Sequence, residues 1–308
     1  MAKNVIVLGS VNRDHVYSLD HIVCPGETVT SHGLNINWGG KGLNQAISLA
    51  KAGQKVKLAA AAAGSDYDGL AKLAQENGLD ISLVKKTDTM TGHAVIQVAS
   101  DGQNSIIVSP GANSEIDSAY IDSVIDSMND DEVILLQNEI SYIDNDGMAV
   151  SSDPYIIGKA SAKGIKVVLN PSPVSDEMRE WPLDKVSTII LNETEGHAIT
   201  GETVPDKILE FFTRRYPKMK VVLTLGSDGS FCLSDGHVSH AEAYKVKAVD
   251  TTAAGDTFLG YFICAVMSGM TDGDALDLAS RASAIAVTRK GAAVSVPRYD
   301  EVARYRFD

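Results

Sequence analysis

Short β-branched runs alternate along this chain with longer segments of helical character, and this alternation constrains the fold more than any other feature. Such alternation is typical of βαβ units, in which a helix carries the chain back to add the next parallel strand. We therefore expect an α/β fold with a doubly wound, mostly parallel sheet and helices on both of its faces. The predicted strands are Val5–Leu8, Lys57–Ala62, Val133–Gln137, Lys166–Leu169, Thr188–Leu191 and Lys220–Leu225, and the predicted helices are Gly42–Ala52, Gly69–Gly78, Ser118–Met128, Ile156–Lys163, Pro205–Tyr216, Asp256–Ser268 and Asp272–Thr288.

Two stretches, residues 11–38 and 91–109, interrupt this rhythm because no helical segment separates their extended runs. Asp101-Gly102 lies between two such runs and is a hairpin signal. We expect both stretches to form one small antiparallel β sheet, a lid or dimer surface that projects from the main domain; an edge extension of the main sheet is the alternative. No repeat or Pro/Gly-rich linker is present, so residues 1–308 are predicted to be a single domain that carries the lid.

The charge balance limits the partners that this chain can bind. Its 27 Lys and Arg residues against 40 Asp and Glu residues give a net charge of −13, which disfavours nucleic acids and anionic membranes. Cys24, Cys232 and Cys264 are an odd number without metal-ligand spacing and suit a reducing compartment. No apolar run reaches membrane-spanning length, so we expect a cytoplasmic location.

Small residues open the helix predicted at residues 256–268, in the run Asp250-Thr251-Thr252-Ala253-Ala254-Gly255-Asp256. The first amide N–H groups of such a helix are unobstructed, and together with the helix dipole they form an anion site. Asp256 could there accept a proton from a hydroxyl that attacks a bound phosphoryl group. The alternative is that Asp256 only caps the helix.

Two further motifs carry groups that suit a polar ligand. Gly39-Gly40-Lys41-Gly42-Leu43-Asn44 lets the backbone approach a ligand closely, although it lacks the spacing of a P-loop and could be only a helix entry. Asn12 and Asp14 follow the first strand with one residue between them, so their side chains point the same way on an extended chain. An amide beside a carboxylate can bind the vicinal hydroxyls of a sugar, and an Asx turn is the alternative.

Polar residues also follow two later strands. Asn192 and Glu195 come after the strand at 188–191, where open α/β sheets bind ligands, and they could hold Mg²⁺ through water or form a capping box. Thr224-Leu225-Gly226-Ser227-Asp228-Gly229 is either a nucleotide-facing loop or a plain hairpin.

Taken together these motifs resemble the ribokinase family of carbohydrate kinases over nearly the whole chain. The resemblance also rests on Gly9-Ser10-Val11-Asn12-Arg13-Asp14-His15, Pro25-Gly26-Glu27-Thr28, Pro110-Gly111-Ala112-Asn113 and Val287-Thr288-Arg289-Lys290-Gly291-Ala292. It implies transfer of the ATP γ-phosphoryl group to the 5-hydroxyl of ribose, with Asp256 as the base and the amides of Ala253, Ala254, Gly255 and Asp256 as the anion hole. The implied sugar contacts are Asn12, Asp14, Gly40, Lys41, Gly42, Asn44 and Glu139, and the implied nucleotide contacts are Asn192, Thr224, Gly226, Ser227, Gly229, Gly255 and Ser280.

The resemblance also implies metals and an assembly. Glu195 with Asn192 would govern Mg²⁺ through its water shell, and the lid would pair with that of a second subunit in a homodimer. Other acceptors of the same family, such as deoxyribose, fructose or adenosine, stay open, as does a non-catalytic sugar or nucleotide sensor. A monovalent cation, usually K⁺, would be surrounded by Asp250, Thr252, Ala286, Arg289, Gly291 and Ser295.

Overall fold

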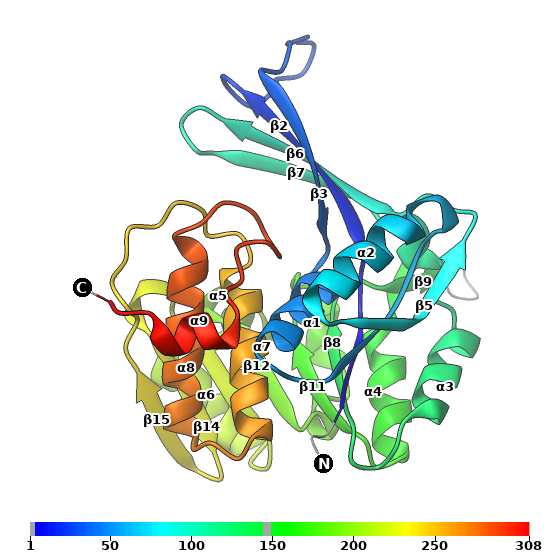
Figure 1. Ribbon diagram of the computed structural model, residues 1–308. Helices are drawn as coiled ribbons and strands as arrows, with labels where there is room; N and C mark the ends of the chain where they lie inside the picture. Colours follow the sequence, from blue (N-terminus) through cyan, green and yellow to red (C-terminus); the bar gives the residue numbers. More distant parts are fainter. Residues whose placement is uncertain (1–3, 144–148, 308) are drawn as a thin grey trace.

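The main body is built on a nine-stranded sheet, seen in the computed structural model, which describes residues 4–143 and 149–307 (Figure 1). Its order is β15-β14-β13-β12-β11-β8-β1-β4-β5, and every pairing from β13 to β5 is parallel. The two strands beyond β13 pair antiparallel. The strands are β1 (Val5–Leu8), β4 (Val56–Ala63), β5 (Asp80–Thr87), β8 (Val133–Gln137), β11 (Lys166–Asn170), β12 (Thr188–Asn192), β13 (Lys220–Thr224), β14 (Ser230–Ser234) and β15 (His237–Ala241).

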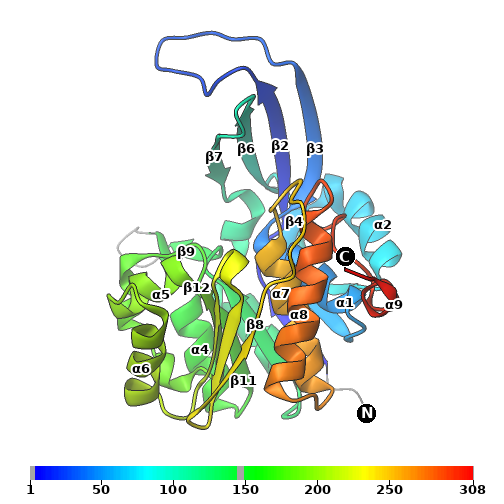
Figure 2. The same cartoon turned by 90° about the vertical axis from the view of Figure 1, so that its left-hand side faces the viewer.

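Helices cover both faces of this sheet, as the alternation of strands and helices predicts (Figure 2). Side chains of β1 alternate between the two cores: Val5 and Val7 pack with one set of helices, and Ile6 and Leu8 with the other. The first core is completed by α1 (Lys41–Lys51), α2 (Tyr67–Asn77), α7 (Ala254–Met267), α8 (Asp272–Val287) and α9 (Tyr299–Arg304), and the second by α3 (Ser118–Ser127), α4 (Asp153–Ala162), α5 (Glu193–Thr200) and α6 (Pro205–Arg215).

The two stretches without helix form a separate four-stranded sheet, the lid, which projects from the main body (Figure 1). Its order is β3-β2-β6-β7, from β2 (Asn12–Leu19), β3 (Gly33–Gly39), β6 (Gly92–Ala99) and β7 (Asn104–Ser109). The outer pairs β2–β3 and β6–β7 are antiparallel as expected, but the central pair β2–β6 is parallel. Each stretch forms its own antiparallel pair, β2 with β3 and β6 with β7. The two pairs join through β2 and β6, which are parallel because both run from the body toward the tip of the lid.

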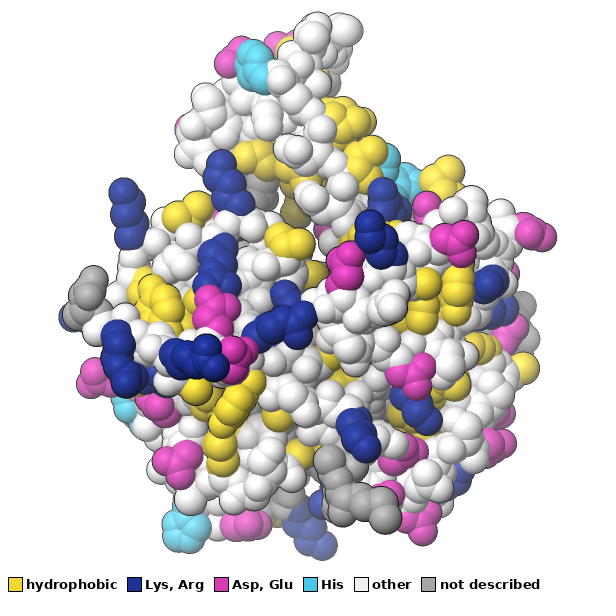
Figure 3. All heavy atoms as spheres, viewed as in Figure 1, with side chains coloured by type: hydrophobic (Ala, Val, Ile, Leu, Met, Phe, Trp, Pro, Cys, Tyr) yellow, Lys and Arg dark blue, Asp and Glu magenta, His cyan; other side chains and the backbone are white. Residues whose placement is uncertain are grey.

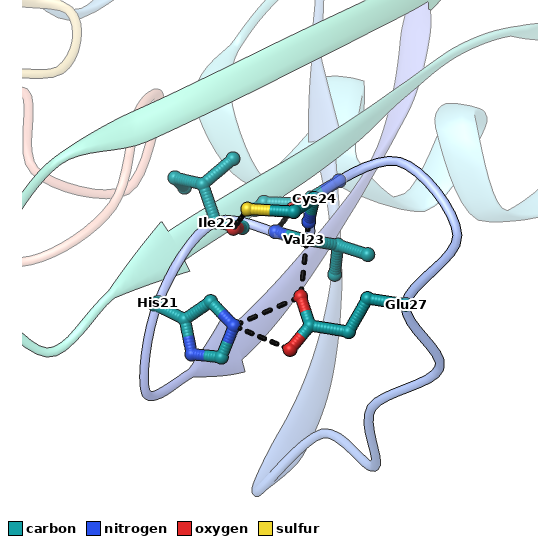
Figure 4. Close-up of polar contacts among 6 residues, drawn as sticks. His21, Ile22, Val23, Cys24 and Glu27 are labelled. Atoms are coloured by element: carbon teal, nitrogen blue, oxygen red, sulfur yellow. Dashed lines mark hydrogen bonds and ion pairs between the residues drawn. The ribbon is translucent and has the colours of Figure 1, made fainter.

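Between β2 and β3 the tip of the lid is tied together by Glu27 (Figure 4). Its carboxylate accepts hydrogen bonds from the ring of His21, at 2.8 Å, and from the backbone N–H of Cys24, at 3.0 Å. These bonds, first that of Cys24 and then that of His21, lower the pKa of Glu27. The long loop at the tip therefore has internal contacts of its own.

Several helices and strands were not predicted from the sequence. They are the short helices α5 and α9, the edge strand β5, the β14–β15 hairpin, and a two-stranded sheet of β9 (Ser141–Ile143) and β10 (Ala149–Ser151). Within residues 4–143 and 149–307, no helix is long and apolar enough to cross a membrane.

Candidate active site

Three cavities follow the edge where the parallel strands end, facing the lid. One of about 500 Å³ lies between the β13–β14 turn and α8, and one of about 270 Å³ lies between β12 and the start of α7. Both are lined by Thr224, Thr251, Ala254 and Gly255, so they lie next to each other. A third of about 360 Å³ lies under the lid strand β7, between Asn12 and Glu139.

Asp256 lies in the first turn of α7 but does not cap this helix, so the capping alternative is wrong. The N-cap is Ala253, which has left-handed backbone at φ 60° and makes no side-chain cap bond. The first helical bond runs from the N–H of Thr257 to the carbonyl of Ala253, at 2.8 Å. The N–H groups of Gly255 and Asp256 precede that bond and are directed out of the helix end, as an anion site requires.

The Asp256 carboxylate is 9% exposed and lines the 270 Å³ cavity. Its Oδ1 accepts a hydrogen bond of 2.9 Å from the side-chain amide of Gln45 in α1. The same amide nitrogen donates to Asn170 at the end of β11, also at 2.9 Å, and the Gln45 oxygen accepts from Gln137, at 2.7 Å. This buried network holds the carboxylate in place, with one oxygen left for another donor.

Gln45, Gln137 and Asn170 are site residues that the sequence reasoning missed. Gln45 directly follows the glycine-rich motif, and Gln137 ends a predicted strand. Their contact with Asp256 could not be predicted, because Gln45 and Asp256 are 211 residues apart in sequence.

Asn12 and Asp14 project from the same face of β2, as the spacing predicts, where the lid joins the body. Asn12 accepts a hydrogen bond of 2.9 Å from Asn113, which rules out a simple Asx turn. Asp14 packs so closely on Gly39 that a Cβ atom added to Gly39 would lie 1.9 Å from Oδ2 of Asp14. Burial, and then the negative charge of Glu139, raise the pKa of Asp14 to about 6.

Glu139 joins these residues to the start of α1. Its Oε2 accepts a hydrogen bond of 2.8 Å from the backbone N–H of Lys41 and another from the hydroxyl of Ser10. Asn12 and Glu139 line the third cavity, and Lys41 lines the second beside Asp256. The hydrogen bond between Lys41 and Glu139 thus links the linings of these two cavities.

Four predicted sugar contacts, Asp14, Gly40, Gly42 and Asn44, are not among the residues that line the three cavities. Gly42 packs on the end of β1, where a Cβ would lie 2.5 Å from the carbonyl carbon of Gly9. Asn44 is buried, and within the described residues its Oδ1 has no hydrogen-bond partner. Gly42 therefore has a packing role in this structure.

The predicted nucleotide residues gather around the 500 Å³ cavity. The run Thr224–Gly229 is the turn of the β13–β14 hairpin, as one of its two alternatives predicts. It also lines this cavity, so its role as a nucleotide-facing loop stays a prediction. Val246, Phe258 and Val287 give the cavity an apolar wall, as an aromatic base requires. The predicted contacts that line it are Thr224, Gly226, Ser227, Gly229, Gly255 and Ser280, whereas Asn192 lines the neighbouring 270 Å³ cavity.

Asn192 and Glu195 do form the capping box that was one of their two interpretations. The Asn192 side chain accepts from the N–H of Glu195, and Glu195 accepts from the N–H of Asn192, both at 2.9 Å. Burial raises the pKa of Glu195, opposed by the hydrogen bond from Asn192 and by Lys41. Both residues line the 270 Å³ cavity with Asp256, so the cap does not remove them from the site.

Asp250 bridges two loops at the end of α8. Its Oδ1 accepts from the N–H of Thr252 and its Oδ2 from the N–H of Gly291, both at 2.9 Å. Burial opposes ionisation, but these bonds outweigh it and lower the pKa of Asp250. The Arg289 guanidinium is paired with Glu301, so only the backbone of Arg289 could face a cation. Ala286 lies in the last turn of α8, and Ser295 is buried in the segment that follows this helix.

Comparison with known proteins shows the family of this chain. The model of the pfkB family carbohydrate kinases matches residues 2–298, and the chain belongs to this family. It is therefore a carbohydrate kinase.

Within the family, the chain is similar to ribokinases. The ribokinase of Haemophilus influenzae is 35% identical over 316 residues, which cover 99% of each chain. The structure of Cryptococcus neoformans ribokinase in complex with ADP has a TM-score of 0.83 and 32% identity, covering 98% of this chain and 99% of the other. That of Arabidopsis thaliana ribokinase, complexed with ribose and ATP, has a TM-score of 0.82 and 27% identity over 99% and 98% of the two chains.

Proposed function

We propose that this protein transfers the γ-phosphoryl group of ATP to the 5-hydroxyl of D-ribose, giving ribose 5-phosphate and ADP. The observation that carries this proposal is the position of Asp256, between the acceptor side at Lys41 and the open N–H groups of α7. The ligands are chosen from the relatives, because the Arabidopsis ribokinase binds ribose and ATP and the Cryptococcus enzyme binds ADP.

In the proposed reaction Asp256 is the general base. It accepts the proton of the 5-hydroxyl as the bond from that oxygen to the γ-phosphorus forms and the bond from phosphorus to the ADP oxygen breaks. The N–H groups of Ala253, Gly255 and Asp256 stabilise the negative charge that develops on the phosphoryl oxygens. The N–H of Ala254, which belongs to the same proposed anion hole, donates in this structure to the carbonyl of Thr251 at 3.1 Å. Gln45 keeps the carboxylate aligned for this transfer.

The sugar is held by Asn12, Asp14, Lys41 and Glu139, while Gly40 and Gly42 pack on the backbone of Ser10 and, with Asn44, support these residues. Ionised Asp14 and Glu139 accept hydrogen bonds from hydroxyls, and Asn12 can add a donor and an acceptor. ATP binds across the neighbouring 500 Å³ and 270 Å³ cavities, with its base in the 500 Å³ cavity and its phosphates toward Gly255.

The residues present fit both proposed metal ions. Within the described residues, no group of three or more His, Cys, Asp and Glu side chains could hold a metal directly. This suits Mg²⁺ bound through phosphates and water, with Glu195 and Asn192 ordering the water shell. The Asp250 carboxylate, fixed by two N–H donors, suits K⁺ together with oxygens of Thr252, Ala286, Arg289, Gly291 and Ser295.

We also infer a homodimer formed through the lid. Large hydrophobic side chains are exposed on both faces of the lid, and Figure 3 shows hydrophobic side chains gathered on it above the body. They are Leu34, Ile36, Ile106, Ile107 and Val108. A monomer rarely leaves such a patch uncovered, so a second lid is the proposed cover. The three free cysteines fit a cytoplasmic location.

The base assignment is tested with Asp256→Asn, which keeps the shape of the side chain but cannot accept the proton. We expect kcat with ribose to fall about 10²- to 10⁴-fold, as general-base catalysis typically contributes that much. The affinity for ADP, measured by calorimetry, should stay close to that of the wild type. Asp68→Asn is the matched control, because Asp68 also lies in the first turn of a helix but is exposed.

Undiminished turnover by Asp256→Asn would contradict the assignment. A wild-type protein that binds ribose and ADP but transfers no phosphoryl group would instead be a sensor.

A further inference from the structure

The loop of residues 242–250, between β15 and α7, forms one wall of the 500 Å³ cavity through Ala243, Tyr244, Lys245, Val246 and Ala248. It contains no regular secondary structure. Within the described chain, its backbone hydrogen bonds to other segments come from the N–H groups of Val249 and Asp250, which both donate to the carbonyl of Val287. The wall from 242 to 248 must therefore be positioned by side chains.

Tyr244 is the side chain that anchors this loop. Its hydroxyl donates to Asp277 of α8 at 2.6 Å, and its ring lies against that of Phe307, with centroids 4.2 Å apart. The guanidinium of Arg281 lies 5.5 Å from the Tyr244 ring centroid and 5.4 Å from that of Phe307. The loop is thus joined to α8 and to residues 305–307 at a single cluster.

Phe307 is itself held in place. Its ring contacts that of Tyr305, with centroids 4.8 Å apart, and Arg281 donates hydrogen bonds to the carbonyls of Val302 and Tyr305, at 3.3 and 3.2 Å. These contacts fix the segment after α9, a helix that lies against α8 (Figure 1). Since α8 supplies Ser280, Ser283 and Ala284 to the opposite wall, the cluster sets the distance between the two walls.

We propose that Tyr305 and Phe307 are positioning residues that hold Tyr244, and with it the 242–248 wall, in the shape that accepts the nucleotide base. The inference rests on the proposed binding of ATP in this cavity. Without the Phe307 ring the loop must be ordered by the nucleotide itself, which lowers nucleotide affinity. The sugar site, on the other side of Asp256, does not depend on this cluster.

The test compares Phe307→Ala with the conservative Phe307→Tyr and with Tyr299→Ala, an exposed aromatic of α9 without a recorded contact to the loop. In Phe307→Ala we expect the KM for ATP and the Kd for ADP to rise about 3- to 10-fold, since an aromatic pair contributes roughly that factor. The KM for ribose at saturating ATP should not change. Both other variants should match the wild type.

Hydrogen exchange is a second measurement, which does not depend on the catalytic activity of the protein. Phe307→Ala should exchange faster in residues 242–248, with unchanged exchange in β1, β8 and β11. The inference is overturned if Phe307→Ala keeps the wild-type ADP affinity and loop exchange, or if the KM values for ATP and ribose rise together. A wild-type protein that does not bind ADP would instead refute the proposed function on which the inference depends.

Discussion

Ionised Asp14 lowers the stability of the folded protein at neutral pH, and in the proposed function the same carboxylate binds the sugar. Its carboxylate is largely buried beside Glu139, and burial first, then that neighbouring charge, raise its pKa to about 6. The folded-state pKa thus lies above the unfolded value of about 3.9. The favourable contribution of protonated Asp14 to stability is complete below the unfolded pKa and is lost as the pH rises through 6. At neutral pH the folded protein therefore carries a largely buried charge, which in the proposed function accepts hydrogen bonds from the sugar.

Asp14→Asn separates these two effects. At pH 7 we expect the KM for ribose to rise about 10-fold or more, because hydrogen bonds to a charged acceptor are lost. The free energy of unfolding, measured with urea, should not fall, since a buried charge has been removed. The wild-type KM should rise as the pH drops below about 6, whereas that of Asp14→Asn should stay flat there.

Asp20→Asn is the control, because Asp20 lies on the same lid but is exposed. A wild-type KM for ribose in Asp14→Asn at pH 7 would show that Asp14 does not touch the sugar.

At the scale of elements, the sequence predicted the central strands well because they are buried on both faces and read as continuous apolar runs, as in Val133–Gln137. It missed β5, an edge strand whose sequence DISLVKKT mixes charged and apolar residues. The helix α5 has only 8 residues, so its periodicity is weak, although its capping box was considered. The parallel pairing of β2 with β6 joins segments about 80 residues apart, and no local pattern encodes such a pairing.

The proposed K⁺ site in the loops at the end of α8 can be tested by its effect on the reaction rate. We expect K⁺ to raise the rate of ribose phosphorylation relative to Na⁺, and Asp250→Ala to need about 10- to 100-fold more K⁺ for the same activation, as is typical when a metal site loses a supporting group. Titration of the initial rate with KCl at constant ionic strength measures this. Asp206→Asn, an exposed residue in the first turn of α6, should respond as the wild type does. A rate that does not depend on K⁺ would rule out the cation site.

At the scale of the whole molecule, the site is assembled from residues that lie far apart in the sequence. The sequence located many of them because parallel strands deliver their carboxyl ends to one edge, as for Asn192 after β12 and Thr224 at the end of β13. It could not give the contacts between them, such as Gln45 with Asp256 or Asn113 with Asn12, since these depend on how helices and lid pack.

The assembly of two molecules through the lid is testable with a double variant, Ile106→Lys with Ile107→Lys, which places a charge on each face of the lid. We expect the wild type to sediment as a dimer and this variant as a monomer at micromolar concentration, since a lysine is costly to bury at an interface. Val238→Lys, at an equally exposed position on β15 of the main sheet, should remain a dimer. A wild type that stays monomeric, or a double variant that stays dimeric, would contradict the lid interface.

In the proposed reaction ribose receives the phosphoryl group of ATP on its 5-hydroxyl. This is tested by kcat/KM for ribose, deoxyribose, fructose and adenosine with saturating ATP, Mg²⁺ and K⁺, together with the NMR spectrum of each product. We expect the highest kcat/KM for ribose and a product whose phosphorus couples to the protons on carbon 5. Equal values for all four acceptors, a higher value for another acceptor, or a phosphate on a different carbon would contradict it.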